Sequence, residues 1–585
     1  MSVTPAGPRR GLRGPTYLNL ALALVLLAVF VLHLTTQPTT SPPTIAEISP
    51  QAVAQIKKQP PQQATRFGTK PAKGTKNGDA GGNVPGTGKG AGGGPGPGAG
   101  PGDAQGRAQH QCFGSPPRQT EDPQSPPCVP FWTGDNGGST SMGVTRDTIT
   151  VVAPTRVDPV LVAFFNYRFE FYGRKLDVKA TNESACDTAG HQAGADTDVQ
   201  SYHPFAAGYY FGCYGIPYYT EMARKKVISV ASYAPVMGES LMAKWHPYMW
   251  QYGMDTDTEM DNLGDWSCRR LVGRKATHAG MSGAGPGAED LSALTRKLAI
   301  VREPLDSGNG LLYVDVNPIV DALKACGTDV TVIKNNQTQS GADLATVQQL
   351  KDGHYTTVFC ACTYSMYSTM STAKQQLYYP EWIVSSVGLM DTNYYVTPAN
   401  PFGSVQFPSD ELAHLFGLTF QPRQVDSDNS YPALAEEQTT DGAYIGYDSS
   451  SAAILNPDYR WMLLLSSGIQ LAGPHLTPES FARGLQQAEF PNPENVQRVG
   501  KVGFGSGRHG MTIDGAEFWW QNGAHPPYAD TDWGGSFCYA DHGQRYSVGE
   551  WPTGPDPFFR APCDSGGPGS PPGSPMGKPG TSDPP

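Results

Sequence analysis

The sequence predicts an α/β protein with two doubly wound lobes, preceded by an apolar segment and a long disordered linker. Apolar strands alternate with helical stripes in two successive series, which is the pattern that parallel sheets require. The folded portion, about residues 129–563, is too long for one ordinary core. Glycine- and proline-rich stretches flank it on both sides.

The N-terminal segment has the composition of a membrane anchor. Residues 17–34 form an uncharged apolar run, and Arg9, Arg10 and Arg13 precede it. About 18 apolar residues can span the hydrocarbon of a bilayer, and basic residues before the run orient it with the N-terminus in the cytoplasm. No small-x-small cleavage pattern follows at once. We therefore expect a cytoplasmic N-terminus (1–16) and an uncleaved single-pass signal anchor (17–34) in the cell membrane, with the folded domain extracytoplasmic. A removed signal peptide is the alternative.

Residues 35–127 read as a flexible tether. They include the stretch "GGNVPGTGKGAGGGPGPGAGPG", which has too little apolar surface to offset the entropy of ordering. A coil of about 90 residues has a typical reach of roughly 50–60 Å. We expect a disordered linker here and a disordered tail at 564–585.

Charge argues against a nucleic-acid partner. The whole chain has a formal net charge of −11. Its first 127 residues are basic, so the folded portion is more acidic than the chain as a whole. An acidic surface repels phosphate backbones, and we expect no nucleic acid as partner.

The ten cysteines all lie beyond the apolar run, and an even number outside the membrane indicates disulfides. Cys186 follows the second predicted strand and Cys213 ends the third, so we expect these two to pair. By elimination, Cys112 pairs with Cys128 and Cys538 with Cys563. The pairing of the remaining four stays open: Cys268, Cys326, Cys360 and Cys362. A zinc site is disfavoured because the chain has no CxxC pair.

The first α/β series begins with the strand in "GVTRDTITVV", residues 143–152. A helix follows from Pro159, with an apolar stripe at Val160, Phe164, Tyr167 and Phe171. The remaining predicted elements are the strand "KLDVKAT", the strand "PFAAGYYF", the helix "GIPYYTEMARKK", the strand "VISVAS" and a helix over 256–271.

The second series opens at "RKLAIVREPLDSGNG". It continues through a helix over 313–325, the strand "DVTVI", a helix over 344–350 and the strands "TTVFCA" and "EWIVSS". Two series of similar size predict two lobes, and in such sheets ligands bind at the carboxyl ends of the strands.

In this order the segments resemble the leucine/isoleucine/valine-binding family of ABC transporter substrate-binding proteins. "GVTRDTITV" with "YGRKLDVKAT" resembles the opening of that family, and "RKLAIVREPLDSGNG" resembles the start of its second lobe. "GAYIGYDSSSAAI", "LTPESFARGLQQ" and "GRHGMTIDGAEFWW" match later segments in the same order. The resemblance implies a type I periplasmic-binding-protein fold with a hinge, divided as lobe 1 (128–293), lobe 2 (294–416), a lobe 1 return (417–490) and a lobe 2 closing segment (491–563).

One departure puts the ligand in doubt. The glycine-rich loop that lines the family's pocket is replaced by "PTRVDP", and the first helix is shorter than usual. The resemblance therefore implies a small-molecule solute and an ABC permease as partners but does not name the solute.

Motifs for catalysis or cofactors are weak. "GSGRHG", residues 505–510, fits G-x-G-x-x-G, but a hairpin-like alternation follows it where a nucleotide site needs a helix. "DTDTEMDN", residues 255–262, lacks the glycine of an EF-hand loop and reads as a helix start. Neither HExxH nor GxSxG occurs. Seven histidines are scattered without the spacing of a helical pair: His246, His278, His354, His414, His475, His509 and His542. We therefore expect no enzyme, no catalytic residue, no metal and no cofactor.

Binding residues are expected in the loops that follow the strands: 211–215, 231–235, 303–310, 362–368 and 386–392. These loops are rich in hydroxyls and small residues, which suit a polar ligand. The predicted ligand-binding residues are Tyr214, Ser232, Tyr233, Tyr364 and Asp391. The functional expectation is a membrane-tethered solute-binding protein; the alternative is a ligand-free interaction or sensor module of the same fold.

Overall fold

The computed structural model describes the larger part of the folded portion. The described residues are 112–113, 118–119, 124–153, 157, 159–181, 187–208, 215–232, 237–280, 288–303, 314–336, 339–362, 365–393, 396, 398, 406–422, 457–492, 500–525, 534–560 and 563–564.

The first sheet has five parallel strands in the order β4-β3-β5-β6-β7. Its core residues are almost completely buried, as expected for a sheet with helices on both faces. The strands are β3 (Thr148–Ala153), β4 (Lys175–Ala180), β5 (Ala206–Ala207), β6 (Ile228–Ala231) and β7 (Met249–Gln251).

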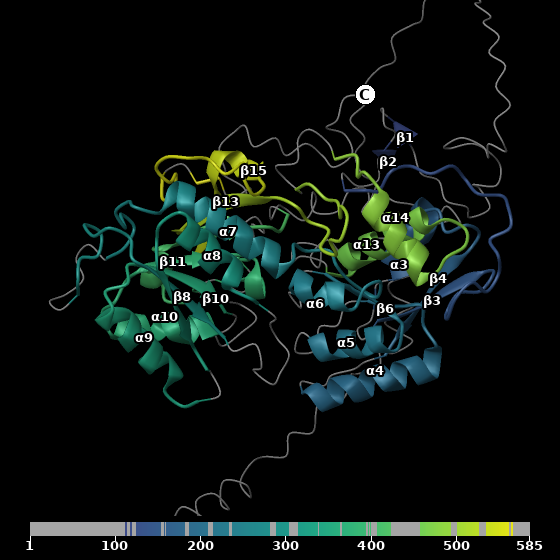
Figure 1. Cartoon of the computed structure of the whole chain (residues 1–585), viewed down its shortest axis with the longest axis horizontal. Helices are drawn as coiled ribbons and strands as arrows, with labels where there is room; N and C mark the ends of the chain where they lie inside the picture. The colour runs from purple at the N-terminus through teal and green to yellow at the C-terminus, as the bar shows by residue number, and fades with distance from the viewer. Residues whose placement is uncertain are drawn as a thin grey trace, which may run out of the picture. The chain divides into compact units, whose positions relative to one another are not determined.

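Helices cover both faces of this sheet (Figure 1). One face carries α4 (Thr188–Tyr202), α5 (Ile216–Arg224) and α6 (Glu239–Lys244). The other carries α3 (Pro159–Arg168), α13 (Pro457–Ala472) and α14 (Pro478–Gln487).

The second sheet has eight strands, and its first five are parallel in the order β9-β8-β10-β11-β12. β13 and β14 extend it in antiparallel pairing, and β15 pairs with β13. The strands are β8 (Leu298–Arg302), β9 (Val330–Lys334), β10 (Thr357–Ala361), β11 (Glu381–Val384), β12 (Leu415–Thr419), β13 (Gly515–Asn522), β14 (Gly535–Tyr539) and β15 (Arg545–Tyr546).

Two helical layers cover the second sheet. On one face lie α9 (Ala342–Asp352), α10 (Ser365–Gln375) and α11 (Ser409–Leu412). On the other lie α7 (Thr256–Arg270) and α8 (Asn317–Ala325). Two 3₁₀ turns, η3 (Val387–Leu389) and η5 (Ala540–Gly543), follow β11 and β14.

The parallel parts of the two sheets share one topology. In each, the first strand of the series lies between the second and the third, which is the order 2-1-3-4-5 of doubly wound folds. The order reverses between β3 and β5 in the first sheet and between β8 and β10 in the second. The prediction of two doubly wound α/β lobes is confirmed.

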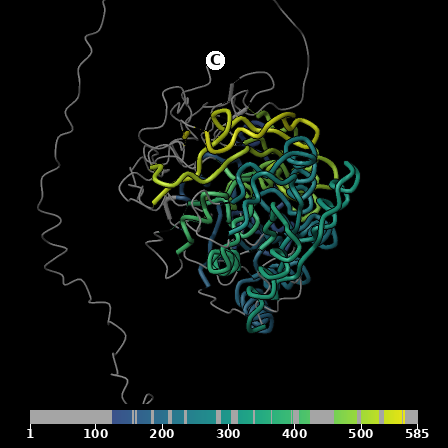
Figure 2. Tube along the Cα trace, turned by 90° about the vertical axis from the view of Figure 1, so that its left-hand side faces the viewer, coloured from purple at the N-terminus to yellow at the C-terminus, as the bar shows by residue number. Residues whose placement is uncertain are grey.

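Helix α7 belongs to the core of the second sheet, whereas the sequence analysis placed it in the first lobe. Trp266 Nε1 donates to Glu517 Oε1 of β13 at 2.8 Å, and Arg270 forms a salt bridge to the same carboxylate. α7 and β13 lie side by side although about 250 residues separate them in the sequence (Figures 1 and 2). The chain thus leaves the first sheet at Tyr252–Asp255, directly after β7.

Helix α4 was not predicted, because it has no apolar stripe. Asp187 caps its N-terminus by accepting from the Gly190 amide, and only four of its residues are buried: His191, Gly194, Ala195 and Asp198. Packing through small side chains leaves no hydrophobic period to read in a sequence.

The prediction of a disordered linker over 35–127 is wrong for its last part, where several residues are described. β1 (Cys112–Phe113) pairs with β2 (Arg118–Gln119), and residues 124–126 are buried. Gln124 Nε2 donates to the Gly500 carbonyl at 3.2 Å, and the Tyr252 hydroxyl donates to Gln124 Oε1. The predicted anchor, 17–34, lies outside the described residues, among which no helix is long and apolar enough to cross a membrane.

Both partners are known for three disulfides in the described part of the chain. Cys538–Cys563 is present, as predicted. The four cysteines whose pairing was open form Cys268–Cys326, between the ends of α7 and α8, and Cys360–Cys362, at the end of β10. Cys128 is disulfide-bonded, and its predicted pairing with Cys112 stays a prediction. Cys186 and Cys213 lie outside the described residues.

Candidate functional site

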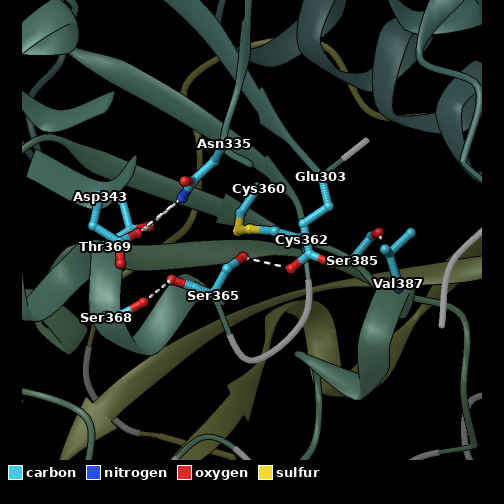
Figure 3. The surroundings of a disulfide bond; sticks show 10 residues. All are labelled: Glu303, Asn335, Asp343, Cys360, Cys362, Ser365, Ser368, Thr369, Ser385 and Val387. Atoms are coloured by element: carbon cyan, nitrogen blue, oxygen red, sulfur yellow. Dashed lines mark hydrogen bonds between the residues drawn. A yellow bond between two sulfur atoms is a disulfide. The ribbon is translucent and has the colours of Figure 1, made fainter. Parts of the chain in front are cut away.

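The candidate site lies at the carboxyl edge of the second sheet, where the strand order reverses. Glu303 follows β8 and Cys362 follows β10, and these two strands flank the reversal. Asn335 and Ser385 come directly after the neighbouring strands β9 and β11. Parallel strands end at one edge, so four chain segments contribute polar groups to the same place (Figure 3).

One side of this edge is rigid. Asn335 is completely buried, and its Nδ2 donates to Asp343 Oδ1 at 2.9 Å and to Thr369 Oγ1 at 3.0 Å. The Thr369 hydroxyl also donates to Asp343 Oδ1, at 2.7 Å. These bonds fasten the first turn of α9 and the middle of α10 to the end of β9, so this group positions the edge and leaves little capacity for a ligand.

Glu303 is an acidic group at the reversal of strand order, directly after β8. It is partly exposed, and the Ser365 hydroxyl at the start of α10 donates to its Oε1 at 2.6 Å. The Cys360–Cys362 disulfide lies beside this pair (Figure 3). By joining residues two apart, it fixes the conformation of the chain where β10 ends and the following loop begins.

Buried carboxyl groups lie behind the end of β11. Glu259 Oε2 of α7 accepts from the Ser385 hydroxyl at 3.0 Å. Asp391 accepts from Ser386 Oγ at 2.5 Å, Thr419 Oγ1 at 2.6 Å and Gln421 Nε2 at 2.5 Å. Both carboxylates are at most 2% exposed. Their partners are hydroxyls and an amide, and among the described residues no cation pairs with either.

Burial therefore favours the protonated forms. It raises the pKa of Asp391 to about 6 against the three hydrogen bonds. Burial, and then the neighbouring Asp391, raise the pKa of Glu259 well above its ordinary value. Asp255, the N-cap of α7, has its pKa raised to about 6, also chiefly by burial.

On the first sheet, Ser232 directly follows β6. It is completely buried, and its Oγ has no hydrogen-bond partner among the described residues. The carbonyl of Ser232 accepts from the amide of Gly253, at the point where the chain leaves this sheet. A buried hydroxyl without a partner is costly, so its place at a strand end singles it out as a candidate contact.

The chain passes between the two sheets three times: at residues 252–255, between β12 and α13, where residues 420–422 are the described start of the connection, and at residues 511–514. The first and third are joined, because the Thr512 amide and hydroxyl both donate to the Tyr252 carbonyl, at 3.1 and 2.9 Å. Arg545 joins the second and third. Its guanidinium donates to the carbonyls of Phe420 and Gln421 and forms a buried salt bridge to Asp514 at 2.8 Å.

The structure describes two of the five predicted ligand-binding residues. Ser232 and Asp391 occupy strand ends on different sheets, and Asp391 is engaged by three internal hydrogen bonds. Tyr214, Tyr233 and Tyr364 lie outside the described residues. Sequence reasoning named the loops that begin at Glu303, Cys362 and Ser386, and all three do follow strands. It missed Glu259, whose only sequence signal was its place in the acidic start of a helix.

Searches against protein-family models and against curated proteins give no match. Similar solved structures are substrate-binding proteins of ABC transporters. A solute binding protein from Rhodopseudomonas palustris HaA2, in complex with p-hydroxybenzoic acid, is 10% identical at a TM-score of 0.43, covering 69% of this chain and 97% of that chain. A fatty acid ABC transporter substrate-binding protein from Thermomonospora curvata is 13% identical at a TM-score of 0.40, covering 71% and 98%.

A leucine binding protein from Thermotoga maritima is 10% identical at a TM-score of 0.41, covering 65% of this chain and 96% of that chain. The three proteins differ in the ligands that they are named for. The architecture of the present chain rests on its own strand order and its three crossovers.

Proposed function

We propose that this chain is a membrane-tethered extracytoplasmic solute-binding protein, which captures a small polar ligand between its two lobes for an ABC-type importer. The observation that carries the proposal is the set of three crossovers between two sheets of the same topology. A few residues in such connections can absorb the rotation of one lobe against the other, which is how hinged binding proteins close on a ligand.

The chemistry of the strand ends supports a polar ligand. Ser232 has a hydroxyl without a hydrogen-bond partner among the described residues, and Glu303 with Ser365 offers an acceptor and a hydroxyl at the reversal of strand order. The predicted contacts Tyr233 and Tyr364 would add aromatic surface and two more hydroxyls. Such a mixture holds a small molecule by hydrogen bonds between apolar walls.

The tether is supported by the sequence alone. The basic residues, the apolar run over 17–34 and the glycine-rich stretch have the order of an anchor followed by a spacer. The folded lobes would then work outside the cytoplasm, where the disulfides are stable. The protein would present its ligand to a permease in the same membrane.

The test begins with the full-length protein in detergent. Any small molecule that co-purifies is released by denaturation and identified by mass spectrometry, and it is then added back to ligand-free protein. We expect saturable binding and a fall in the radius of gyration measured by small-angle X-ray scattering. Absence of both a bound molecule and closure would favour the alternative, a ligand-free interaction or sensor module.

Ser232→Ala tests the strand-end assignment with a matched control. Losing one neutral hydrogen bond should weaken binding about 2- to 15-fold. Ser466→Ala is the control, because Ser466 is also completely buried and its Oγ also lacks a partner among the described residues, but it lies inside α13. Equal affinities for the two variants would remove Ser232 from the site. Unchanged affinity in Tyr233→Ala and Tyr364→Ala would contradict the cleft assignment as a whole.

A further inference from the structure

A second polar cluster lies on the first lobe, away from the strand ends just described. Glu239 begins α6, His246 follows the end of that helix, and His509 lies in the glycine-rich turn 505–510. Backbone pairing brings the turn to α6: the Gln251 amide of β7 donates to the His509 carbonyl at 3.0 Å, and the Met511 amide donates to the Gln251 carbonyl at 2.9 Å.

The hydrogen bonds of His509 indicate which of its ring nitrogens carries a proton. Its Nδ1 lies 2.6 Å from Glu239 Oε1, and its backbone amide donates to Glu239 Oε2 at 2.9 Å. Nδ1 must carry the proton, because a carboxylate oxygen only accepts. In the tautomer of neutral imidazole that has this proton, Nε2 carries the lone pair, and Nε2 lies 2.9 Å from His246 Nδ1.

The two rings differ in exposure. His509 is 2% exposed, and its ring lies 4.7 Å from that of Trp250, which fixes its orientation. His246 is exposed to solvent.

We propose that His246 and His509 form a surface site for a divalent transition-metal ion such as Zn²⁺, with Glu239 orienting His509. Neutral imidazole nitrogens are preferred ligands of zinc, copper and nickel. In a tetrahedral site with Zn–N bonds of 2.0–2.1 Å, two nitrogens lie about 3.3 Å apart, so the observed pair must open by a few tenths of an ångström and both rings must turn until their lone pairs meet at the ion.

Metal binding replaces the hydrogen bond between the rings. The proton on His246 Nδ1 moves to its Nε2, which faces solvent, and the freed Nδ1 lone pair binds the ion; no net proton is released. The carboxylate of Glu239 on His509 Nδ1 is the arrangement that commonly supports histidine ligands of metals.

Water fills the remaining positions of the ion. Among the described residues no three His, Cys, Asp or Glu side chains are placed to hold one metal. A site with two protein ligands exchanges its ion readily, and the bound ion would fasten the turn 505–510 to the first lobe beside the third crossover.

The experiment uses the full-length protein after treatment with a chelator. Calorimetric titration with Zn²⁺ at pH 7 should show a site that His246→Ala removes, and this exposed substitution should not disturb folding. Glu239→Gln should weaken Zn²⁺ binding about 10- to 100-fold. His354→Ala is the control and should leave the site intact: His354 is also exposed beside a carboxylate, Glu289, at 3.2 Å, but its bonds in the described structure include no second imidazole.

Electron paramagnetic resonance with Cu²⁺ distinguishes the outcomes further. Wild-type protein should give the hyperfine pattern of two imidazole nitrogens, and His246→Ala should lose one of them. If the protein binds no Zn²⁺ at this site, or if His246→Ala and His354→Ala have the same affinity, the contact is a structural hydrogen bond and the proposal is wrong.

Discussion

The two ends of strand β11 hold buried carboxylates in opposite ways. At its amino end, Glu381 is completely buried and accepts from Arg296 Nε at 2.7 Å and Nη2 at 2.8 Å. Arg296 also pairs with Asp556 at 3.0 Å. Behind its carboxyl end, Asp391 and Glu259 are equally buried but bond to hydroxyls and an amide.

The difference is that some of these buried carboxylates are paired with a cation and others are not. At the amino end, despite burial, the hydrogen bond from His278 and the charge of Arg296 hold the pKa of Asp556 below its ordinary value. At the carboxyl end, burial raises the pKa of Asp391 to about 6. Buried carboxyl groups without a cationic partner cost stability, and Glu411 beside the amino half of β11 is another of them: it is completely buried, its Oε2 accepts from Trp382 Nε1 at 2.8 Å, and burial raises its pKa well above the ordinary value.

The largest change in stability is expected from substitution of Glu381. Glu381→Gln should lower the free energy of unfolding by about 3–5 kcal/mol, because it leaves the buried Arg296 without its bidentate partner. Urea unfolding at pH 7 measures the change. Asp135→Asn is the control, since its ion pair with Arg146 is about 70% exposed on both sides and should contribute at most about 1 kcal/mol. Equal effects would mean that the amino-end network does not stabilise the fold.

The disulfides extend the comparison to covalent bonds. The Cys268–Cys326 disulfide joins the end of α7 to the residue that ends α8, before β9, and its cysteines are 58 residues apart. The Cys360–Cys362 disulfide lies at the carboxyl end of β10, and its cysteines are two residues apart. In the chain-entropy model the first stabilises by about 4 kcal/mol and the second by about 1–2 kcal/mol. Double Cys→Ala variants, unfolded in urea under oxidising conditions, should show this order. The reverse order would mean that the Cys360–Cys362 bond holds more of the native structure than its own loop.

A third comparison concerns pH. The folded state holds the Asp391 proton up to about pH 6, whereas the unfolded chain releases it near pH 4. Its contribution to stability is therefore present below about pH 4 and is lost as pH rises through 6. About two pKa units correspond to about 3 kcal/mol.

Asp391→Asn should remove this loss, so the variant should lose less stability than wild type between pH 4 and 7 in urea unfolding. Gln421 can reverse its amide to accept from the new side chain, since its Oε1 has no partner among the described residues. Asp514→Asn is the control: Asp514 pairs with Arg545, and the variant should be destabilised at pH 7. An unchanged pH slope in Asp391→Asn would contradict the assignment of the raised pKa.

Much of the secondary structure could be read from the sequence. Continuous apolar runs predicted β6, β8, β10 and β11 to within a few residues, because buried parallel strands are apolar on both faces. The G-x-G-x-x-G stretch was not interpreted as a nucleotide site, and Gly505 and Gly507 adopt the positive φ of a turn there. The helix over 188–202 escaped notice because small side chains bury it.

The sequence by itself determined the alternation of strands and helices, and with it two doubly wound lobes whose polar loops follow apolar strands. Only the tertiary structure decided which distant residues meet. Glu259 reaches Ser385 because α7 crosses to the second sheet, Arg545 joins two crossovers, and His509 reaches Glu239 through backbone pairing with β7. Periodicity records which face of an element is buried. It does not tell which residue more than one hundred positions away along the chain will be the contact partner, because the packing of the whole chain selects that partner.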